Sequence, residues 1–176
     1  TLVNHIFGGQ FTARLNMNLR QDKGYSYGYN SWIEWQNNSS VFMSGGGVQT
    51  NVTKEAITET LKEYNAIVSD RPITTDEFEA SQASIIRQFP AGFETSNQIL
   101  NHLIRLVIFG LPLDYYSSHI DRITNLTLEQ IREAALGHVD SRKLMILIVG
   151  DQEMIEPELA LLNIPIQKIG PEGQLL

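Results

Sequence analysis

The residues best suited to hold a metal ion are the four histidines, and their spacing does not form a metal site. None of His5, His102, His119 and His138 begins His-x-x-Glu-His, the helical spacing that places two imidazoles on zinc beside a general base. None shows the inverted form of that motif. The absence of cysteine also excludes disulfides, cysteine nucleophiles and thiolate metal sites. We therefore expect no metal ligands and no cofactor in this chain.

The other side chains that could act as nucleophiles or bases also lack the necessary context. Serine and threonine are plentiful, but there is no Gly-x-Ser-x-Gly elbow and no Ser-x-x-Lys. Gly45-Gly-Gly47 lacks the Lys-Ser/Thr that completes a phosphate-binding loop. Acidic pairs such as Asp76 and Glu77 are explained by the dipole at a helix N-terminus. We expect no peptide-bond cleavage by this chain alone.

One segment near the N-terminus carries a more specific pattern, Phe7-Gly-Gly-Gln-Phe-Thr-Ala-Arg-Leu15 followed by Leu19-Arg-Gln-Asp-Lys-Gly-Tyr-Ser-Tyr27. It resembles the non-catalytic domains of the pitrilysin/insulinase family of zinc metallopeptidases. Those domains carry Leu-Gly-Gly-x-Phe-Ser-Ser-Arg-Leu and then Leu-Arg-Glu-x-x-Gly-Leu-Ala-Tyr. Residues 73–82, 126–132 and 144–151 resemble later family motifs in the same order. The resemblance extends from Thr1 to about Asp151.

The resemblance implies a division of labour between two homologous domains that close on each other like a clamshell. One domain holds zinc on a His-x-x-Glu-His helix, and the other contributes an Arg and a Tyr seven residues apart. Arg20 and Tyr27 have that spacing, so the resemblance implies that they assist catalysis in an assembled protease. Gly8, Gly9 and Arg14 match the motif as candidate substrate-binding residues. The implied partners are a catalytic peptidase domain, in the same chain or a separate subunit, which carries the zinc, and a peptide substrate.

Each of these residues also has a purely structural explanation. Arg20 lies near a predicted helix C-terminus, where a cation is favourable, and Asp22 is a possible ion-pair partner. Tyr27 could be an ordinary strand aromatic, and close packing would explain Gly8, Gly9 and Arg14. Two other functions stay open. One is a proteolytically inert scaffold or assembly module, because family relatives include core proteins of a respiratory complex; the other is a free peptide-binding protein.

The elements that must position these residues follow from hydrophobic periodicity and capping signals. Apolar spacing predicts a helix over 2–20, unless Gly8-Gly9 breaks it into two shorter helices. Alternation predicts a hairpin of strands 25–35 and 41–50, with a turn at 36–40, and Gly45-Gly-Gly47 either weakens the second strand or marks a bulge. Thr53 is predicted as an N-cap, and Thr74 and Thr127 begin capping boxes. The other predicted elements are helices 54–69, 74–89, 95–109, 113–123, 127–138 and 153–162, and a buried strand over 142–150.

This order of elements predicts an α+β fold, in which an antiparallel sheet is layered against several helices. We expect residues 1–176 to form a single non-catalytic peptidase-family domain, a fragment of a longer protein that lacks its first strands. Such a gap would leave a sheet edge exposed and favour self-association. The net charge of −7 and scattered Lys and Arg exclude nucleic acid and an anionic membrane as expected partners. The compartment is not specified, with the bacterial periplasm favoured over the cytoplasm.

Overall fold

The computed structural model describes residues 1–37 and 39–176, which form a mainly helical structure around one antiparallel hairpin. The predicted α+β class is confirmed. In chain order the elements are α1 Leu2–Phe7, α2 Arg14–Asn16, the π-helix η1 Met17–Asp22, β1 Asn30–Trp35, β2 Ser40–Gly45, the 3₁₀ helix η2 Thr50–Val52, α3 Thr53–Ala66, α4 Thr75–Gln88, the 3₁₀ helix η3 Pro90–Phe93, α5 Ser96–Ile108, α6 His119–Thr124, α7 Leu128–His138, the 3₁₀ helix η4 Ser141–Lys143, α8 Gln152–Leu159 and the 3₁₀ helix η5 Ala160–Leu162.

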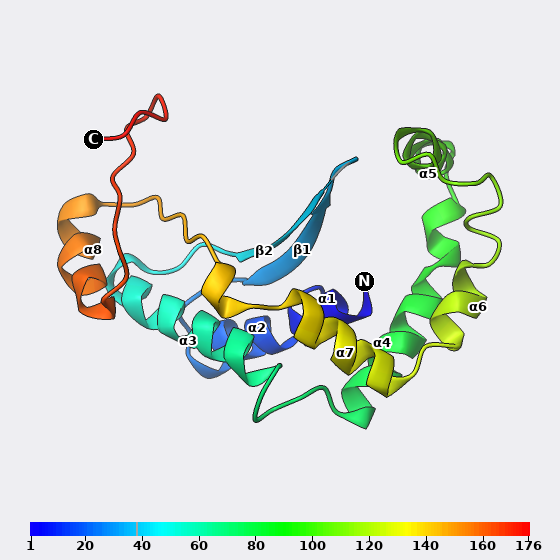
Figure 1. Ribbon diagram of the computed structural model, residues 1–176, viewed down its shortest axis with the longest axis horizontal. Coiled ribbons are helices and arrows are strands. Elements are labelled where there is room, and N and C mark those ends of the chain that lie inside the picture. The colour runs from blue at the N-terminus through cyan, green and yellow to red at the C-terminus, as the bar shows by residue number, and fades with distance from the viewer. Residues whose placement is uncertain (38) are drawn as a thin grey trace.

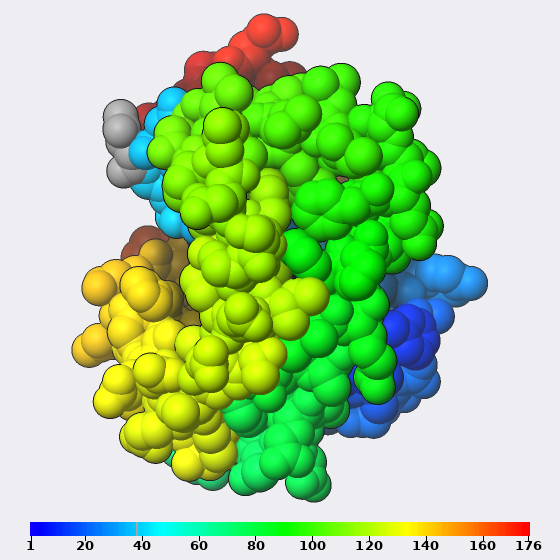
Figure 2. Space-filling model, turned by 90° about the vertical axis from the view of Figure 1, so that its right-hand side faces the viewer, coloured from blue at the N-terminus to red at the C-terminus, as the bar shows by residue number. Residues whose placement is uncertain are grey.

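The helices surround the hairpin unevenly. Helices α1, α2, α3 and α7 lie along one side of the hairpin, α4 to α6 form one end of the molecule, and α8 with the C-terminal segment forms the other (Figure 1). Seen from the α4–α6 end, these three helices cover most of the visible surface (Figure 2). Among the described residues, no helix has both the length and the apolar character needed to cross a membrane.

The N-terminal helix is interrupted at Gly8-Gly9, so of the two predicted arrangements the broken one is confirmed. The break lets the first strand approach the helix closely. The Gly8 carbonyl accepts a hydrogen bond from the Ser31 N–H at 2.9 Å, and a Cβ on Gly8 would lie 2.6 Å from the Ser31 nitrogen. Any larger residue at Gly8 would therefore push the hairpin away from α1.

The hairpin is shorter than predicted. Its register runs from Asn30 opposite Gly45 to Trp35 opposite Ser40, so residues 25–29 and 46–50 lie outside the ladder. A single bridge joins Ser26 to Val48 beyond it. Asn38, in the predicted turn, lies outside the described residues.

Two of the three predicted helix caps are confirmed and one is wrong. Thr74 and Thr127 both form the predicted capping boxes, and Thr95 forms a further one with Gln98. The predicted N-cap at Thr53 is wrong, because η2 precedes α3 and makes Val52 the cap residue. The Thr53 hydroxyl instead donates to the Thr50 carbonyl at 2.9 Å.

The core lies where α1, η1 and α3 meet the inner face of the hairpin. Phe7, Phe42 and Tyr64 form its aromatic centre, with the Phe7 and Tyr64 ring centroids 4.7 Å apart in an edge-on arrangement. The Tyr64 hydroxyl donates to the Ser44 hydroxyl at 3.0 Å, so the buried polar group is satisfied. Leu15 and Leu19 are fully buried beside it, and they fix the segment that carries Arg20.

The predicted strand over 142–150 is wrong. Residues 141–143 form η4, and the apolar residues that follow make no ladder with any described strand. An apolar run can be extended without being a strand, because a ladder also needs a hydrogen-bonded neighbour. Met145 and Val149 are consequently 95% and 92% exposed rather than buried.

Candidate functional site

The structure places Arg20 on η1 with its guanidinium against two aromatic rings. The Arg20 Cζ lies 4.6 Å from the centroid of the Phe11 ring and 5.4 Å from that of the Tyr27 ring. Both distances are within the range of a cation–π interaction, which is worth about 0.5–1 kcal/mol at an exposed site. The two residues paired by their spacing in the sequence are therefore brought together, and Phe11 joins them.

The guanidinium has no anionic partner in the described part of the chain. Arg20 forms no ion pair there, and the sequence-based alternative, Asp22, does not pair with it. Its N–H groups donate to no acceptor among the described residues. Among the described residues, the Arg20 guanidinium is therefore held by ring contacts alone.

Tyr27 is presented to solvent by a loop, not by a strand. Its side chain is 92% exposed, and Phe11 is 56% exposed. Both rings that contact the Arg20 guanidinium are therefore open to solvent.

The loop that carries Tyr27 is anchored on both sides of it. Before Tyr27, the Tyr25 N–H donates to the Leu19 carbonyl at 2.8 Å, and the buried Ser26 hydroxyl bonds to the carbonyls of Gly28 and Gly47 at 2.8 Å each. These bonds fix the backbone while leaving the tyrosine ring outside. The phenol is thus exposed on a fixed support.

Asn16 connects the two aromatic residues of the site. It is buried; its side-chain amide donates to the Phe11 carbonyl at 2.7 Å, and its oxygen accepts from the Tyr29 N–H at 3.1 Å. One side chain therefore ties the Phe11 turn to the loop that holds Tyr27. Sequence reasoning missed Asn16, because nothing in a helical spacing marks a buried amide.

Gly46 lies directly under the same loop. A Cβ there would come within 2.2 Å of the Gly28 carbonyl oxygen and 3.1 Å of the Tyr29 Cα. A Cβ added at Gly45 or Gly47 would instead enter open space, with nothing within 4 Å of it. Of the three glycines, only Gly46 is needed to let β2 come close to the backbone of Gly28 and Tyr29.

Gly9 and Arg14, the other residues of the motif, make contacts inside the fold. Gly9 faces Asn4, whose side-chain nitrogen would lie 2.6 Å from a Cβ at Gly9. Arg14 is buried, and its guanidinium donates to both Glu77 carboxylate oxygens at 2.6 Å and to the carbonyls of Arg71 and Pro72. These contacts hold α2 against the start of α4, so Arg14 is not included in the site proposed below.

The ion pair between Arg14 and Glu77 helps to lower the pKa of the Glu77 carboxyl. Burial by itself raises the pKa of Glu77, but the hydrogen bonds from Arg14 and from Thr74, together with the Arg14 charge, outweigh it and hold the pKa below its ordinary value. The charged pair is therefore part of the folded structure at neutral pH.

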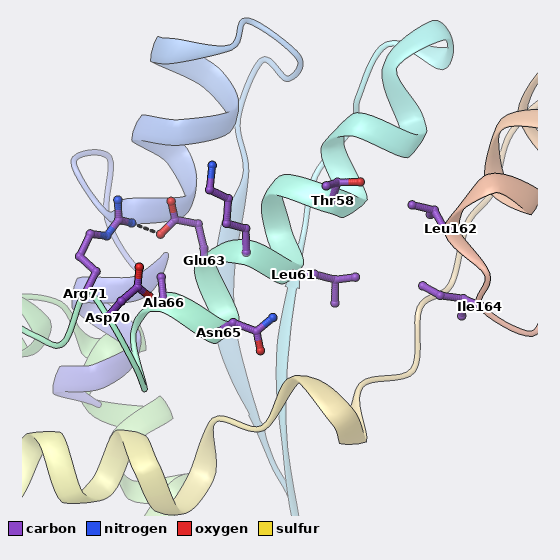
Figure 3. A pocket seen from close by; sticks show the side chains of 10 residues that line it. Thr58, Leu61, Glu63, Asn65, Ala66, Asp70, Arg71, Leu162 and Ile164 are labelled. Carbon is purple, nitrogen blue, oxygen red and sulfur yellow. Dashed lines mark hydrogen bonds and ion pairs between the residues drawn. The ribbon is translucent and has the colours of Figure 1, made fainter.

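A separate pocket of about 540 Å³ lies against α3 and the turn that follows it. In Figure 3 the ion pair of Arg71 and Glu63 closes one side of it, while Leu162 and Ile164 reach it from the C-terminal segment. None of the predicted site residues lines this pocket. Across residues 1–37 and 39–176, no group of three or more His, Cys, Asp or Glu side chains is placed to hold a metal ion.

Comparison with known proteins relates this chain to one family of peptidases. Residues 1–85 match the family model described as the peptidase M16 inactive domain, M16 being the pitrilysin/insulinase-type peptidases. A Helicobacter pylori protein named "Non-peptidase homolog YmxG" is 22% identical over 151 residues, which is 84% of this chain and 34% of that protein. A Bacillus subtilis protein named "Uncharacterized zinc protease YmxG" is 27% identical over 96 residues, 54% of this chain and 23% of that protein.

A solved peptidase M16 inactive domain from Pseudomonas fluorescens has the same fold. The TM-score is 0.71 and the sequence identity is 21%. The match covers 81% of this chain and 34% of the Pseudomonas fluorescens chain. The chain thus spans about a third or less of the length of these relatives. The resemblance seen in the sequence is confirmed: the chain carries the sequence of the peptidase M16 inactive domain over residues 1–85 and the fold of a solved M16 inactive domain over most of its length.

Proposed function

We propose that this domain binds peptide substrate for a zinc metallopeptidase whose catalytic half lies in another domain. Arg20 and Tyr27 make the contacts with the substrate, and Phe11 orients the Arg20 guanidinium. The observation that carries the proposal is the free guanidinium between two exposed aromatic rings. The described residues present no cluster that could hold zinc, and in this proposal the metal and its chemistry are supplied by the partner domain.

The chemistry of peptide hydrolysis suits these two side chains. Negative charge develops on the scissile carbonyl oxygen, and donors held at that position stabilise the transition state. A guanidinium offers several N–H donors in a planar fork and a phenol offers one O–H. Both can also bond to carbonyl groups of an extended substrate backbone. The loop anchored by Ser26 and the rings around Arg20 reduce the entropy lost when substrate binds.

The test is turnover by the assembled peptidase, meaning this domain together with its catalytic half. Arg20→Ala and Tyr27→Phe should each lower kcat/KM for a peptide by ~100- to 1000-fold, as expected for losing a transition-state donor. Zinc content should stay at the wild-type level because neither residue contacts the metal. Wild-type turnover in both variants would refute the proposal.

The chain supplies a matched control for these substitutions. Arg122 lies over the Tyr115 ring with its Cζ 4.4 Å from the centroid, the same chemical pair at a different place. Arg122→Ala removes this contact together with the hydrogen bonds from Arg122 to Ser118 and to the Tyr115 carbonyl, and Tyr115→Phe removes only a phenol hydroxyl at the α6 end of the molecule. We expect turnover near the wild-type value in both.

A second candidate function is a proteolytically inert scaffold of the same fold. It is favoured by the name of the Helicobacter pylori relative, a non-peptidase homolog. The discriminating observation is the sequence of the partner domain or subunit, because a zinc peptidase requires a His-x-x-Glu-His or inverted motif there. A partner that carries neither would favour the scaffold.

A further inference from the structure

The segment that carries Arg20, η1, is a π-helix and not a continuation of the α-helix before it. A π-helix bonds each N–H to the carbonyl five residues back rather than four, and here the Lys23 N–H donates to the Asn18 carbonyl at 3.0 Å. Such turns are rare and are frequent at functional sites. Because the wider turn rotates its side chains relative to an α-helix, the direction in which Arg20 points depends on it.

The same turn holds the loop that presents Tyr27. The Leu19 carbonyl accepts hydrogen bonds from the N–H groups of Tyr25 at 2.8 Å and of Ser26 at 3.2 Å. Leu19 is fully buried, so its carbonyl is a fixed point of attachment. Arg20 is the residue after Leu19, and Tyr27 directly follows the attached pair. The geometry of η1 therefore sets where both side chains of the proposed site lie.

Asn18 attaches η1 to the neighbouring helix α3. Its side-chain nitrogen donates to a carboxylate oxygen of Glu59 at 3.0 Å and to one of Glu63 at 2.8 Å. These two carboxylates are four residues apart and share one face of α3. An ionised carboxylate only accepts hydrogen bonds, so the amide must turn its NH₂ end toward them. Asn18 thus uses both of its donors to hold η1 on α3.

Glu59 is paired with two lysines. Its carboxylate oxygens lie 3.8 Å from the Nζ of Lys23 and 3.6 Å from the Nζ of Lys62. Burial by itself raises the pKa of Glu59, but the hydrogen bond from Asn18 and the charges of the two lysines outweigh it and hold the pKa below its ordinary value. The carboxylate is therefore ionised at neutral pH and available as an acceptor for Asn18.

Glu63 is the more deeply buried of the two carboxylates, with a side chain that is 4% exposed. Arg71, in the turn after α3, supplies its cation (Figure 3). Because both carboxylates have cations of their own, neither draws the Arg20 guanidinium toward α3. Asn18 adds hydrogen-bond donors to this cluster without adding a charge. The cluster can therefore hold η1 while Arg20 stays against the two rings.

We propose that Asn18 is a positioning residue: it fixes the π turn of η1 on Glu59 and Glu63, and this turn places the Arg20 guanidinium beside the Tyr27 ring. Without the two hydrogen bonds of Asn18, η1 can relax toward α-helical hydrogen bonding, and Arg20 then points in another direction. Asn18 does not contact substrate and acts only through Arg20. This inference rests on the proposed function of Arg20 and Tyr27.

An NMR signal of Arg20 tests the positioning directly. An aromatic ring shields groups that lie over its face, so the Arg20 Nε–H signal should lie upfield of the signals of exposed arginines. The measurement uses the assembled peptidase with the isotopic label confined to arginine, and Arg20→Lys identifies the signal by its loss. Asn18→Ala should move the signal downfield. A signal that stays at its wild-type position would overturn the proposal.

Turnover of the same variant separates the positioning from the proposed function. A misplacement of about 1 Å can lower a rate ~100-fold, so kcat/KM of Asn18→Ala should fall by up to that factor while zinc content stays at the wild-type level. A displaced Arg20 signal together with wild-type turnover would support the positioning and refute the substrate-binding role of Arg20.

Gln82 provides a matched control for a general loss of stability. Its side-chain nitrogen donates to the carbonyls of Ile123 at 2.8 Å and Thr124 at 3.3 Å, and so ties α4 to α6 away from the site. Gln82→Ala removes a comparable amide anchor and should also lower the free energy of unfolding. The Arg20 signal and kcat/KM should nevertheless keep their wild-type values. An Arg20 signal displaced equally by Gln82→Ala would contradict a specific role for Asn18.

Two substitutions at Glu59 cover the case in which Asn18→Ala does not fold. Glu59→Gln and Glu59→Ala both remove the charge that faces Lys23 and Lys62, but only glutamine keeps an oxygen that can accept from Asn18. The Arg20 signal should stay near its wild-type position in Glu59→Gln and move downfield in Glu59→Ala. The same signal position in both variants would refute this hydrogen bond as a positioning contact.

Discussion

At the scale of single residues, the site depends on side chains that hold others in place. Arg20 is oriented by the rings of Phe11 and Tyr27, and Asn16 ties together the backbone segments that carry those rings. Arg20 and Tyr27 can be named from the sequence because their types and spacing match a motif. Phe11 lies in the same motif, but its contact with Arg20 depends on the break after α1, which spacing alone does not specify.

Replacing Asn16 tests whether it supports the site. Asn16→Ala leaves the Phe11 carbonyl and the Tyr29 N–H without their partner, so unfolding free energy should fall by about 1–3 kcal/mol. Turnover of the assembled peptidase should also fall, because the two rings lose their common anchor. Chemical denaturation and kinetics measure the two effects. Asn125→Ala, which removes one exposed hydrogen bond to Asp121, should change both only slightly.

Glu77 gives a prediction about pH. Its folded-state pKa lies below the ordinary 4.5, so the folded state releases the proton more readily than the unfolded state does. The stabilisation is fully present above pH 4.5 and is lost as the pH falls through the folded-state pKa. Denaturation across acidic pH should show this loss in wild type.

Glu77→Gln isolates this contribution, because glutamine can still complete the capping box with Thr74. Near neutral pH the variant should be less stable by about 1.5–3 kcal/mol, the range for hydrogen bonds to a charged group. The difference from wild type should shrink as the pH falls below 4.5. A difference that stays constant with pH would show that the ion pair with Arg14 does not contribute.

At the scale of elements, the two capping boxes are predicted correctly from local signals, and the strand over 142–150 is not found. The capping boxes at Thr74 and Thr127 depend on residues three positions apart, so the sequence alone specifies them. The strand predicted over 142–150 depends on a neighbour that no local pattern can supply. Thr53 fails as a cap for a related reason, because hydrophobic spacing does not reveal the 3₁₀ turn before it.

The glycine run at the end of β2 offers an element-scale test. Gly46→Ala forces a methyl group against the Gly28 carbonyl, so the loop carrying Tyr27 must shift. We expect a loss of about 1–3 kcal/mol in stability, typical of overpacking, together with lower peptide turnover. Gly47→Ala adds the same methyl group to open space and should have little effect. Equal effects of the two substitutions would show that the close approach is unimportant.

At the scale of the whole molecule, the fold is that of an M16 inactive domain, and the chain spans about a third or less of the length of its relatives. Its described residues present no cluster for a metal ion, and Arg20 lies against the exposed rings of Phe11 and Tyr27. We propose that such a domain contributes to substrate binding while another domain performs the hydrolysis. The central claim is therefore that Arg20 and Tyr27 act together on a substrate held between two domains.

A double-mutant cycle on the assembled peptidase tests that claim most directly. The values of kcat/KM for wild type, Arg20→Ala, Tyr27→Phe and the double variant give the coupling between the two side chains. We predict a large loss in each single variant, a smaller further loss in the double variant than independent action would give, and unchanged zinc content in all four proteins. Losses that simply add in the double variant, or four equal values of kcat/KM, would contradict the account.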